Sequence, residues 1–494
     1  MSIWRTKSIE QSIKDTDEPG HALRKDLTGF DLIVFGIGVI IGTGIFVVTG
    51  RQAAENAGPA IIVSFLIAGL VCALAAMCYA EFASTVPVAG SAYTFGYASL
   101  GEFVAWIIGW DLILEFTLAA SVVAVGWSAY AGDLLGIPTS IAITDDYGVN
   151  VGAMAIVILL GVVSTLGAKL SGRVTAVVVA IKVAIVLFVI VVGAFYVKAS
   201  NWTPFVPPAE PVPAETQSIG HQPLTQVLLG LEPSSFGIWG VIAAASVVFF
   251  AFIGFDIVAT TAEETKNPKR DMPVGIFGSL IIVTVLYMAV AAIVTGMRPY
   301  TELNSDAPLA EAFRGVGADW AATLISLGGV IGITTVILVL MMGQSRVAFA
   351  MSRDGLLPRG LSKTHPRFGT PYVMTGITTV AVALLAGLVP ISALEEMVNI
   401  GTLFAFVVVS VGVIVLRRTR PDLPRAFRAP WVPVLPVIAA LACGWLMLNL
   451  TVDTWIRFLV WMLLGVIVYF CYGMRKSRLA RAEHTPTVKD DSAD

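Results

Sequence analysis

Long apolar runs, separated by short polar stretches, make up most of the chain. Runs of about 20 mostly apolar residues, the length of a helix that crosses a lipid bilayer, begin near twelve positions: Phe30, Pro59, Glu102, Val151, Gly172, Ile238, Met272, Ala318, Pro371, Leu394, Val434 and Thr454. A backbone in lipid must satisfy its own hydrogen bonds, and these runs are much longer than barrel strands, so they predict helices. The expected fold is an all-α integral membrane protein with twelve transmembrane helices.

The composition agrees with a membrane protein. Of the 494 residues, 56% are hydrophobic and only 13% are charged, whereas a soluble domain carries about 25% charged residues. This excludes an ordinary soluble enzyme, and the net charge of −3 gives no argument for binding nucleic acid. The four cysteines show no CxxC spacing and the four histidines lie outside the apolar runs, so neither a disulfide framework nor a metal site is expected.

The distribution of lysine and arginine predicts how the chain crosses the membrane. With both termini in the cytoplasm, 25 of the 31 basic residues fall in inside segments, 5 fall outside, and one, Lys182, lies within a span. This positive-inside bias favours a multi-pass protein of the cell membrane with cytoplasmic N- and C-termini. Residues 1–29 are then a cytoplasmic segment rather than a signal peptide. Residues 199–237 are an extracellular proline-rich loop with a short helix around Leu224 to Leu231, and residues 474–494 are a cytoplasmic tail.

The first span is interrupted by glycines. It reads GIGVIIGTGIFVVTG from Gly36 to Gly50. A dinucleotide-binding fingerprint is excluded, because its third glycine comes one position late, at Gly42, and no strand precedes it. Close helix packing through Gly38 and Gly42 is one interpretation. The other is that the helix unwinds in mid-membrane at Gly42-Thr43-Gly44.

The sixth span is irregular at a corresponding depth. It reads VVFFAFIGFDIVATTAEE from Val247 to Glu264 and carries Gly254 and Asp256 near its middle. Two interrupted spans, five apart, indicate an inverted repeat and a transporter binding site between its halves. N–H groups where span one resumes would attract a carboxylate, and carbonyls freed after Phe250 would accept from an ammonium group. The pair therefore suits an amino acid zwitterion.

Four ionisable residues lie inside spans: Asp111, Glu115, Lys182 and Asp256. Such residues are functional candidates because they are costly in lipid. Asp111 and Glu115 share one helix face, although Asp111 could instead be solvated near the membrane surface. Lys182 could extend its ammonium group to the surface, or it could neutralise carbonyl dipoles as a bound Na⁺ would while exchanging a proton. Asp256 could cap the second half of span six, which is compatible with a functional role.

Five long motifs carry a resemblance to a known family: GIGVIIGTGIF (36–46), YAEFASTVPVAGSAYTF (79–95), GWDLILEF (109–116), FFAFIGFDIVATTAEETKNPKRDMP (249–273) and MSRDGLLP (351–358). Together they strongly resemble the amino acid–polyamine–organocation (APC) superfamily, and within it the bacterial cationic amino acid transporter-like family. The resemblance covers spans one to ten in order. It implies a LeuT-type 5+5 inverted repeat, with residues 30–198 and 238–416 as its halves and two further helices in 417–473.

The resemblance also implies roles for particular residues. It assigns substrate-carboxylate binding to Ile40, Thr43 and Gly44, carbonyls for the substrate amine to Phe250, Ala251 and Ile253, the substrate side-chain contact to Ile333, and proton coupling or gating to Lys182, Glu115 and Asp256. Lys182 matches a lysine that stands where sodium-coupled relatives hold Na⁺, which favours H⁺ as the coupling ion.

The expected function is secondary active amino acid transport. A bulky, uncharged Ile333 would crowd a long basic side chain, so a small or medium neutral amino acid is preferred and a cationic one is the alternative. An amino acid or polyamine exchanger would need the same fold.

No histidine constellation supports a membrane enzyme, no appended soluble domain supports a nutrient sensor, and no GxxxxGK[ST] loop supports ATP as the energy source. No cofactor is expected. The expected partners are an amino acid and membrane lipid, and a small accessory membrane subunit is left open.

Overall fold

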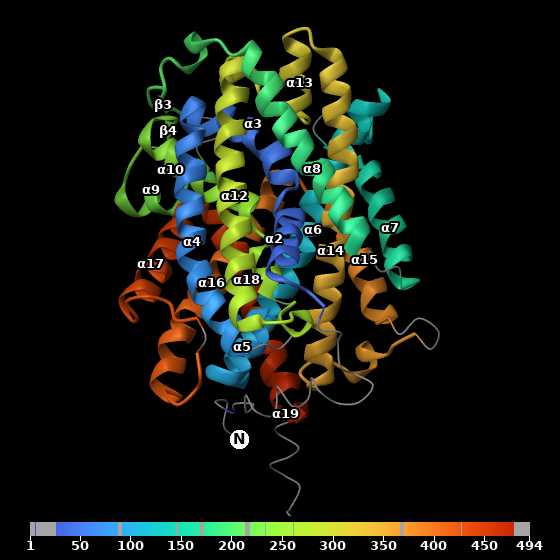
Figure 1. The fold of residues 1–494 in the computed structure, drawn as a ribbon, viewed down its shortest axis with the longest axis vertical. Coiled ribbons are helices and arrows are strands. Elements are labelled where there is room, and N and C mark those ends of the chain that lie inside the picture. The colour runs from blue at the N-terminus through green and yellow to red at the C-terminus, as the bar shows by residue number, and fades with distance from the viewer. Residues whose placement is uncertain are drawn as a thin grey trace, which may run out of the picture.

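The computed structural model describes residues 5, 26–86, 91–144, 147–167, 172–212, 218–232, 234–259, 261–365, 370–425 and 427–478. Most of the expected N-terminal segment and the tail beyond 478 lie outside the described residues. The long helices stand side by side along the longest axis of the molecule (Figure 1). The helix α13 lies at one end of this bundle and α9 at its side, and α5 and α19 lie towards the other end.

The α-helices have the following bounds: α2 Gly29–Ile40, α3 Thr49–Gln52, α4 Ile61–Thr85, α5 Ser91–Ser99, α6 Glu102–Leu135, α7 Val151–Thr165, α8 Gly172–Gly193, α9 Leu224–Leu229, α10 Gly237–Val248, α11 Phe255–Ala259, α12 Pro268–Met297, α13 Pro308–Gly315, α14 Asp319–Arg353, α15 Tyr372–Leu388, α16 Ile391–Thr419, α17 Val434–Leu448, α18 Val452–Val468 and α19 Met474–Lys476. Turns of π-helix occupy Gly44–Val48, Ala53–Ala57 and Tyr469–Gly473. Turns of 3-10 helix occupy Gly58–Ala60, Ala194–Tyr196, Ala199–Trp202, Ile219–His221, Phe249–Phe252, Ala262–Glu264, Tyr300–Glu302 and Arg359–Ser362.

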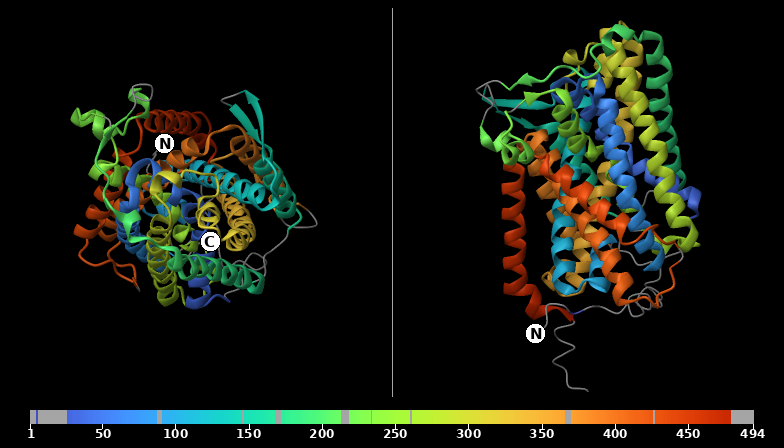
Figure 2. Two further views of the ribbon diagram at one scale, coloured as in Figure 1. Left: turned by 90° about the horizontal axis from the view of Figure 1, so that it is seen from above. Right: turned by 90° about the vertical axis from the view of Figure 1, so that its left-hand side faces the viewer.

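Two small antiparallel sheets of two strands each lie outside the helical bundle. The strands β1 (Ser140–Thr144) and β2 (Tyr147–Asn150) pair with Ser140 opposite Asn150, and they project sideways in Figure 2. The short strands β3 (Glu210–Pro211) and β4 (Ser234–Ser235) pair with each other near α9. These strands were not predicted from the sequence. The short helix expected in the proline-rich loop is confirmed as α9.

The protein is an all-helical membrane protein. Among the described residues, eight helices are long and apolar enough to cross a membrane, and four shorter apolar helices, α2, α7, α15 and α17, accompany them. The sequence placed the starts of the apolar runs well, since the largest difference is that between the expected Met272 and the observed Pro268 of α12. The shorter helices have only 12 to 17 residues, fewer than the usual length of a span.

The interior of the bundle is formed by α6, α14 and α16 together with α10 and α11, because these are the most buried of the long apolar helices. The helix α14 packs along α6, α12 packs along α2 and α4, and α16 packs along α6 and α17. The helices α8 and α18 instead expose much of their apolar surface, and α18 stands at the rim of the molecule in Figure 2. Three stacked indoles, Trp106, Trp110 and Trp461, attach α18 to α6. The helices that carry the least lipid-facing surface are therefore those that can form a site.

A buried carboxylate ties α4 to the segment that follows α16. Both oxygens of Glu81 accept hydrogen bonds from Arg417, at 2.9 and 2.7 Å, and the N–H of Ala429 donates to Glu81 Oε2 at 2.8 Å. The guanidinium of Arg425 lies 3.5 Å from Glu81 Oε1. One glutamate therefore holds two arginines and a loop at the same end of the bundle.

We expect Glu81→Ala to destabilise the protein by about 3 kcal/mol, because removing one partner leaves buried charges uncompensated. The measurement is the midpoint of thermal unfolding of the purified protein in detergent. Asp422→Ala is the matched control in the same segment, since it removes the more exposed ion pair with Arg420, a type of pair that contributes little. Equal midpoints for the two variants would contradict this role of Glu81.

Candidate functional site

The first interrupted helix consists of α2, the π-helical turn Gly44–Val48 and α3. The helix α2 starts at a capping box between Thr28 and Asp31 and ends at Ile40, after which Ile41 is extended. Gly44 begins the next helical turn pressed against the main chain of the second interrupted helix, so that a Cβ at Gly44 would overlap the Cα of Ala251. The predicted interruption of this span is confirmed, but the helix unwinds at Ile41 and Gly42, whereas Thr43 and Gly44, which were also expected to unwind, are already helical.

The second interrupted helix consists of α10, the 3-10 turn Phe249–Phe252 and α11. Ile253 is extended, and Gly254 has φ +124°, a conformation that favours glycine. Asp256 Oδ1 accepts a hydrogen bond from the N–H of Gly254 at 3.2 Å, which satisfies a free donor at the start of α11. Both the predicted interruption at Gly254 and the predicted cap by Asp256 are confirmed.

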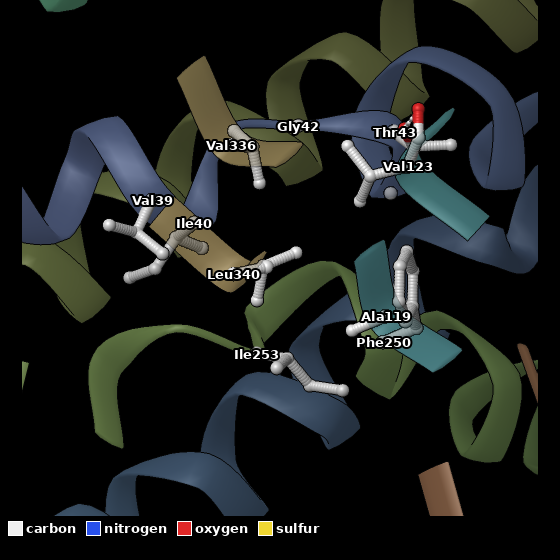
Figure 3. A pocket seen from close by; sticks show the side chains of 11 residues that line it. Val39, Ile40, Gly42, Thr43, Ala119, Val123, Phe250, Ile253, Val336 and Leu340 are labelled. Carbon is white, nitrogen blue, oxygen red and sulfur yellow. Dashed lines mark hydrogen bonds between the residues drawn. The ribbon is translucent and has the colours of Figure 1, made fainter. Parts of the chain in front are cut away.

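A cavity lies where the two interruptions meet (Figure 3). It is lined by Val39, Ile40, Gly42, Thr43, Gly44, Ala119, Val123, Phe250, Ile253, Val336 and Leu340. The protein atoms leave about 300 Å³ of empty space here, counted together with the opening. Of the described residues in this lining, Thr43 alone has a polar side chain, and its Oγ1 donates to the carbonyl of Val123 at 3.4 Å. The side-chain wall of the cavity is thus almost wholly apolar.

Five of the sequence-predicted substrate residues line this cavity: Ile40, Thr43, Gly44, Phe250 and Ile253. Ala251 does not line it but packs against Gly44. Ile333 is fully buried on α14 and is not part of the lining. Lys182, Glu115 and Asp256 also lie outside the lining.

Sequence reasoning missed six lining residues: Val39, Gly42, Ala119, Val123, Val336 and Leu340. Helical spacing could have found four of them. Ala119 and Val123 follow Glu115 at intervals of four residues, and Val336 and Leu340 follow Ile333 by three and seven, so each pair lies on the face of a residue already chosen. Helical spacing does not show at which depth along the helix the cavity lies, so it could not identify which residues of that face line the cavity.

Lys182 contacts the end of α2 rather than the membrane surface. Its side chain is fully buried, and Nζ donates to the carbonyls of Gly38 at 2.5 Å and Ile41 at 3.1 Å. The hydroxyl of Tyr287 donates to the next free carbonyl, that of Ile40, at 2.8 Å. A lysine and a tyrosine thereby satisfy carbonyls left free where α2 ends, and the ammonium faces the negative end of the helix dipole. The interpretation that Lys182 extends to the surface is wrong.

Three carboxylates outside the cavity lining are buried. Asp111, Glu115 and Asp256 are each at most 1% exposed. The carboxylate of Asp111 has no hydrogen-bond partner among the described residues. The alternative that Asp111 is solvated near the membrane surface is therefore wrong. Among the described residues, no group of histidine, cysteine and carboxylate side chains is arranged to hold a metal ion.

The arrangement supplies both signs of partial charge to a small ligand. The N–H groups at the start of Gly44–Val48 and the carbonyls of the unwound segment after α10 come from opposite ends of two helices. Secondary transporters bind their substrates between two interrupted helices, and this cavity lies between two such helices. The molecule is a membrane transporter and not an enzyme.

Comparison with known proteins identifies the family. The sequence profile described as "Amino acid permease" matches residues 27–469, so the chain belongs to the amino acid permease family of the APC superfamily. This confirms the resemblance found in the motifs, and amino acid permease activity is the function of that family.

Three relatives cover nearly the whole chain. The branched-chain amino acid permease BcaP of Bacillus subtilis (strain 168) is 48% identical, over 97% of this chain and 99% of that protein. The methylthioribose transporter of the same organism is 45% identical, with the same coverage. The vacuolar cationic amino acid transporter 4 of Arabidopsis thaliana is 31% identical, over 99% of this chain and 98% of that protein.

Proposed function

We propose that this permease takes up neutral aliphatic L-amino acids, and branched-chain ones in particular, together with protons by alternating access. The observation that carries this proposal is the contrast between the two parts of the cavity. Main-chain groups from two interrupted helices offer N–H and carbonyl partners for the common zwitterion. The wall is formed by aliphatic and aromatic side chains such as Val336, Leu340 and Phe250, which favour an apolar substrate side chain.

The same lining disfavours the two other substrates that relatives suggest. Among the described residues that line the cavity there is no carboxylate, so the charged end of a lysine or arginine substrate would be buried without a partner. The hydroxyl groups of methylthioribose would find one side-chain hydroxyl, that of Thr43, and would otherwise lose their hydrogen bonds to water. A leucine, isoleucine or valine side chain needs neither a charged partner nor a hydrogen-bond partner.

Protons are the proposed coupling ion. Lys182 occupies the end of α2 through its two carbonyl contacts, and among the described residues no carboxylate pairs with its ammonium group. We assign proton coupling or gating to Lys182, Glu115 and Asp256, as expected from the sequence. Exchange of amino acids or polyamines without net proton flow is the second candidate, because it needs the same site.

The finer architecture belongs to this proposal. We infer twelve spans arranged as a LeuT-type 5+5 inverted repeat, with residues 30–198 and 238–416 as the halves and 417–473 as two added helices. In support, α2 with α3 and α10 with α11 are the interrupted helices that open the two halves. We place the protein in the cell membrane with residues 1–29 and 474–494 in the cytoplasm and 199–237 outside. Binding of membrane lipid follows from this placement, and a small accessory subunit stays an open partner.

Competition for uptake tests the substrate class. We expect leucine, isoleucine and valine to compete with labelled leucine for uptake into proteoliposomes at concentrations about a hundredfold lower than lysine or arginine require, because a cationic side chain would be desolvated without a partner. The measurement is initial uptake under an imposed inward proton gradient. Liposomes without protein are the control for leak.

The same panel separates the alternatives. Inhibition by lysine and arginine alone would make the protein a cationic amino acid transporter, and inhibition by methylthioribose alone would remove amino acids as substrates. Uptake that requires amino acid inside the vesicles and does not change with the proton gradient would establish exchange.

A further inference from the structure

Asn399 of α16 reaches across to the second interrupted helix. Its side chain is fully buried, and Nδ2 donates to the carbonyl of Val247 at 3.0 Å. One turn earlier on the same helix, Glu395 pairs with Arg51 of α3 at 3.2 Å. The helix α16 therefore touches both interrupted helices with polar side chains, and Asn399 does so immediately before α10 ends at Val248.

The carbonyl that Asn399 contacts lies where the α-helical hydrogen-bond pattern of α10 ends. In a continuing α-helix the N–H of Ala251 would donate to Val247, four residues earlier. The chain instead turns into 3-10 helix at Phe249–Phe252, in which each N–H turns to the carbonyl three residues earlier. The carbonyl of Val247 thereby leaves the α-helical pattern, and within the main chain it accepts instead from the N–H of Phe249 at the end of α10. The amide of Asn399 gives this carbonyl a second donor, which comes from a different helix.

The rest of the Asn399 side chain gives no comparable benefit. Its Oδ1 is buried and has no hydrogen-bond partner among the described residues, a cost that an apolar residue would avoid. Nearby Thr402 differs, because its hydroxyl bonds to the carbonyl of Val398 in its own helix. Asn399 is therefore better explained by where it holds α10 than by a gain in the stability of α16.

We propose that Asn399 is a positioning residue that fixes the point at which α10 unwinds, and thereby the placement of the carbonyls that receive the substrate amine. Asn399 does not line the cavity, so it acts through the main chain of Val247 to Ile253. This inference rests on the proposed amino acid substrate and goes beyond it, since it assigns recognition of the ammonium group to a side chain outside the cavity.

Asn399→Leu, which keeps a similar volume without the donor, tests the proposal. The readout is the affinity of the purified protein for leucine and for 4-methylpentanoate, the same carbon skeleton without the ammonium group. We expect the variant to bind leucine about tenfold more weakly, the equivalent of one hydrogen bond, with little change for 4-methylpentanoate. The preference for the amine would then fall about tenfold.

Two further variants complete the design. Asn399→Ser shortens the side chain so that it no longer reaches Val247 and should show the same fall in preference, which preserves the test if the leucine variant does not fold. Thr295→Val is the matched control, since it removes a fully buried hydroxyl that bonds only within α12. An unchanged ratio of the two affinities in folded Asn399 variants would overturn the proposal. Failure of the unaltered protein to bind leucine would instead overturn the proposed substrate.

Discussion

Lys182→Ala is expected to reduce proton-driven leucine uptake to the level of protein-free liposomes. The change removes the fully buried ammonium group that donates to Gly38 and Ile41. Two carbonyls at the end of α2 would then lose their donor in a dry interior, and the coupling step would lose its titratable cation. The measurement combines labelled leucine uptake with the signal of a pH-sensitive dye trapped inside the same proteoliposomes.

Two matched variants separate the charge of Lys182 from its packing. Lys182→Met keeps a long alkyl chain against Gly332, which the Lys182 side chain closely approaches, and it should lose coupling as alanine does. Lys198→Ala removes an exposed lysine beyond the end of α8 and should transport normally. If Lys182→Ala still accumulates leucine at the normal rate under a proton gradient, Lys182 has no part in coupling. Retained counterflow with lost accumulation would show that the variant still binds and cycles.

Gly44→Ala is expected to abolish leucine binding while the protein still inserts and purifies. The added methyl group would overlap the main chain at Ala251, so one of the two interrupted helices must move away from the cavity. Overpacking of this kind costs about 1–3 kcal/mol even where side chains can yield, and here the obstacle is backbone. Binding is measured as the stabilisation that leucine gives against thermal unfolding, with elution from a sizing column as the check of folding.

Other glycines supply the graded controls. A Cβ at Gly444 of α17 meets nothing within 4 Å, so Gly444→Ala should bind leucine normally. A Cβ at Gly42 would reach the Val336 side chain at 3.4 Å, an ordinary contact, and Gly42→Ala should weaken binding less than Gly44→Ala. Normal binding by Gly44→Ala would mean that the two interrupted helices do not need their close contact.

Much of the fold and the centre of the site could be predicted because they depend on local sequence. Apolar runs gave the helix starts, and glycines in the middle of such runs gave both interruptions. Asp256 was correctly expected to cap α11, since a carboxylate two residues after a glycine break is a local feature. Lys182 was singled out because a lone charge deep in an apolar run is visible without any neighbour.

The rest depends on how helices register against one another, which leaves little trace in a single sequence. Ile333 was chosen on the right helix, but α14 places Val336 and Leu340 at the depth of the cavity. The arginine partners of Glu81 are more than 300 positions away along the chain, and the bond from Asn399 to Val247 joins residues 152 positions apart. The complete burial of Asp111 could not be predicted, because a residue near the start of a span can equally well be in contact with solvent.

The contact between Gly44 and Ala251 has a consequence for how such a protein changes over generations. Because the obstacle at Gly44 is a neighbouring main chain, no substitution at Ala251 makes room for a larger residue, and the position has no compensating partner. The wall formed by Val336, Leu340 and Phe250 is made of side chains, so a loss of volume at one position can be offset at another. Mutation can retune which side chains the permease accepts, whereas at Gly44 it can only break the site.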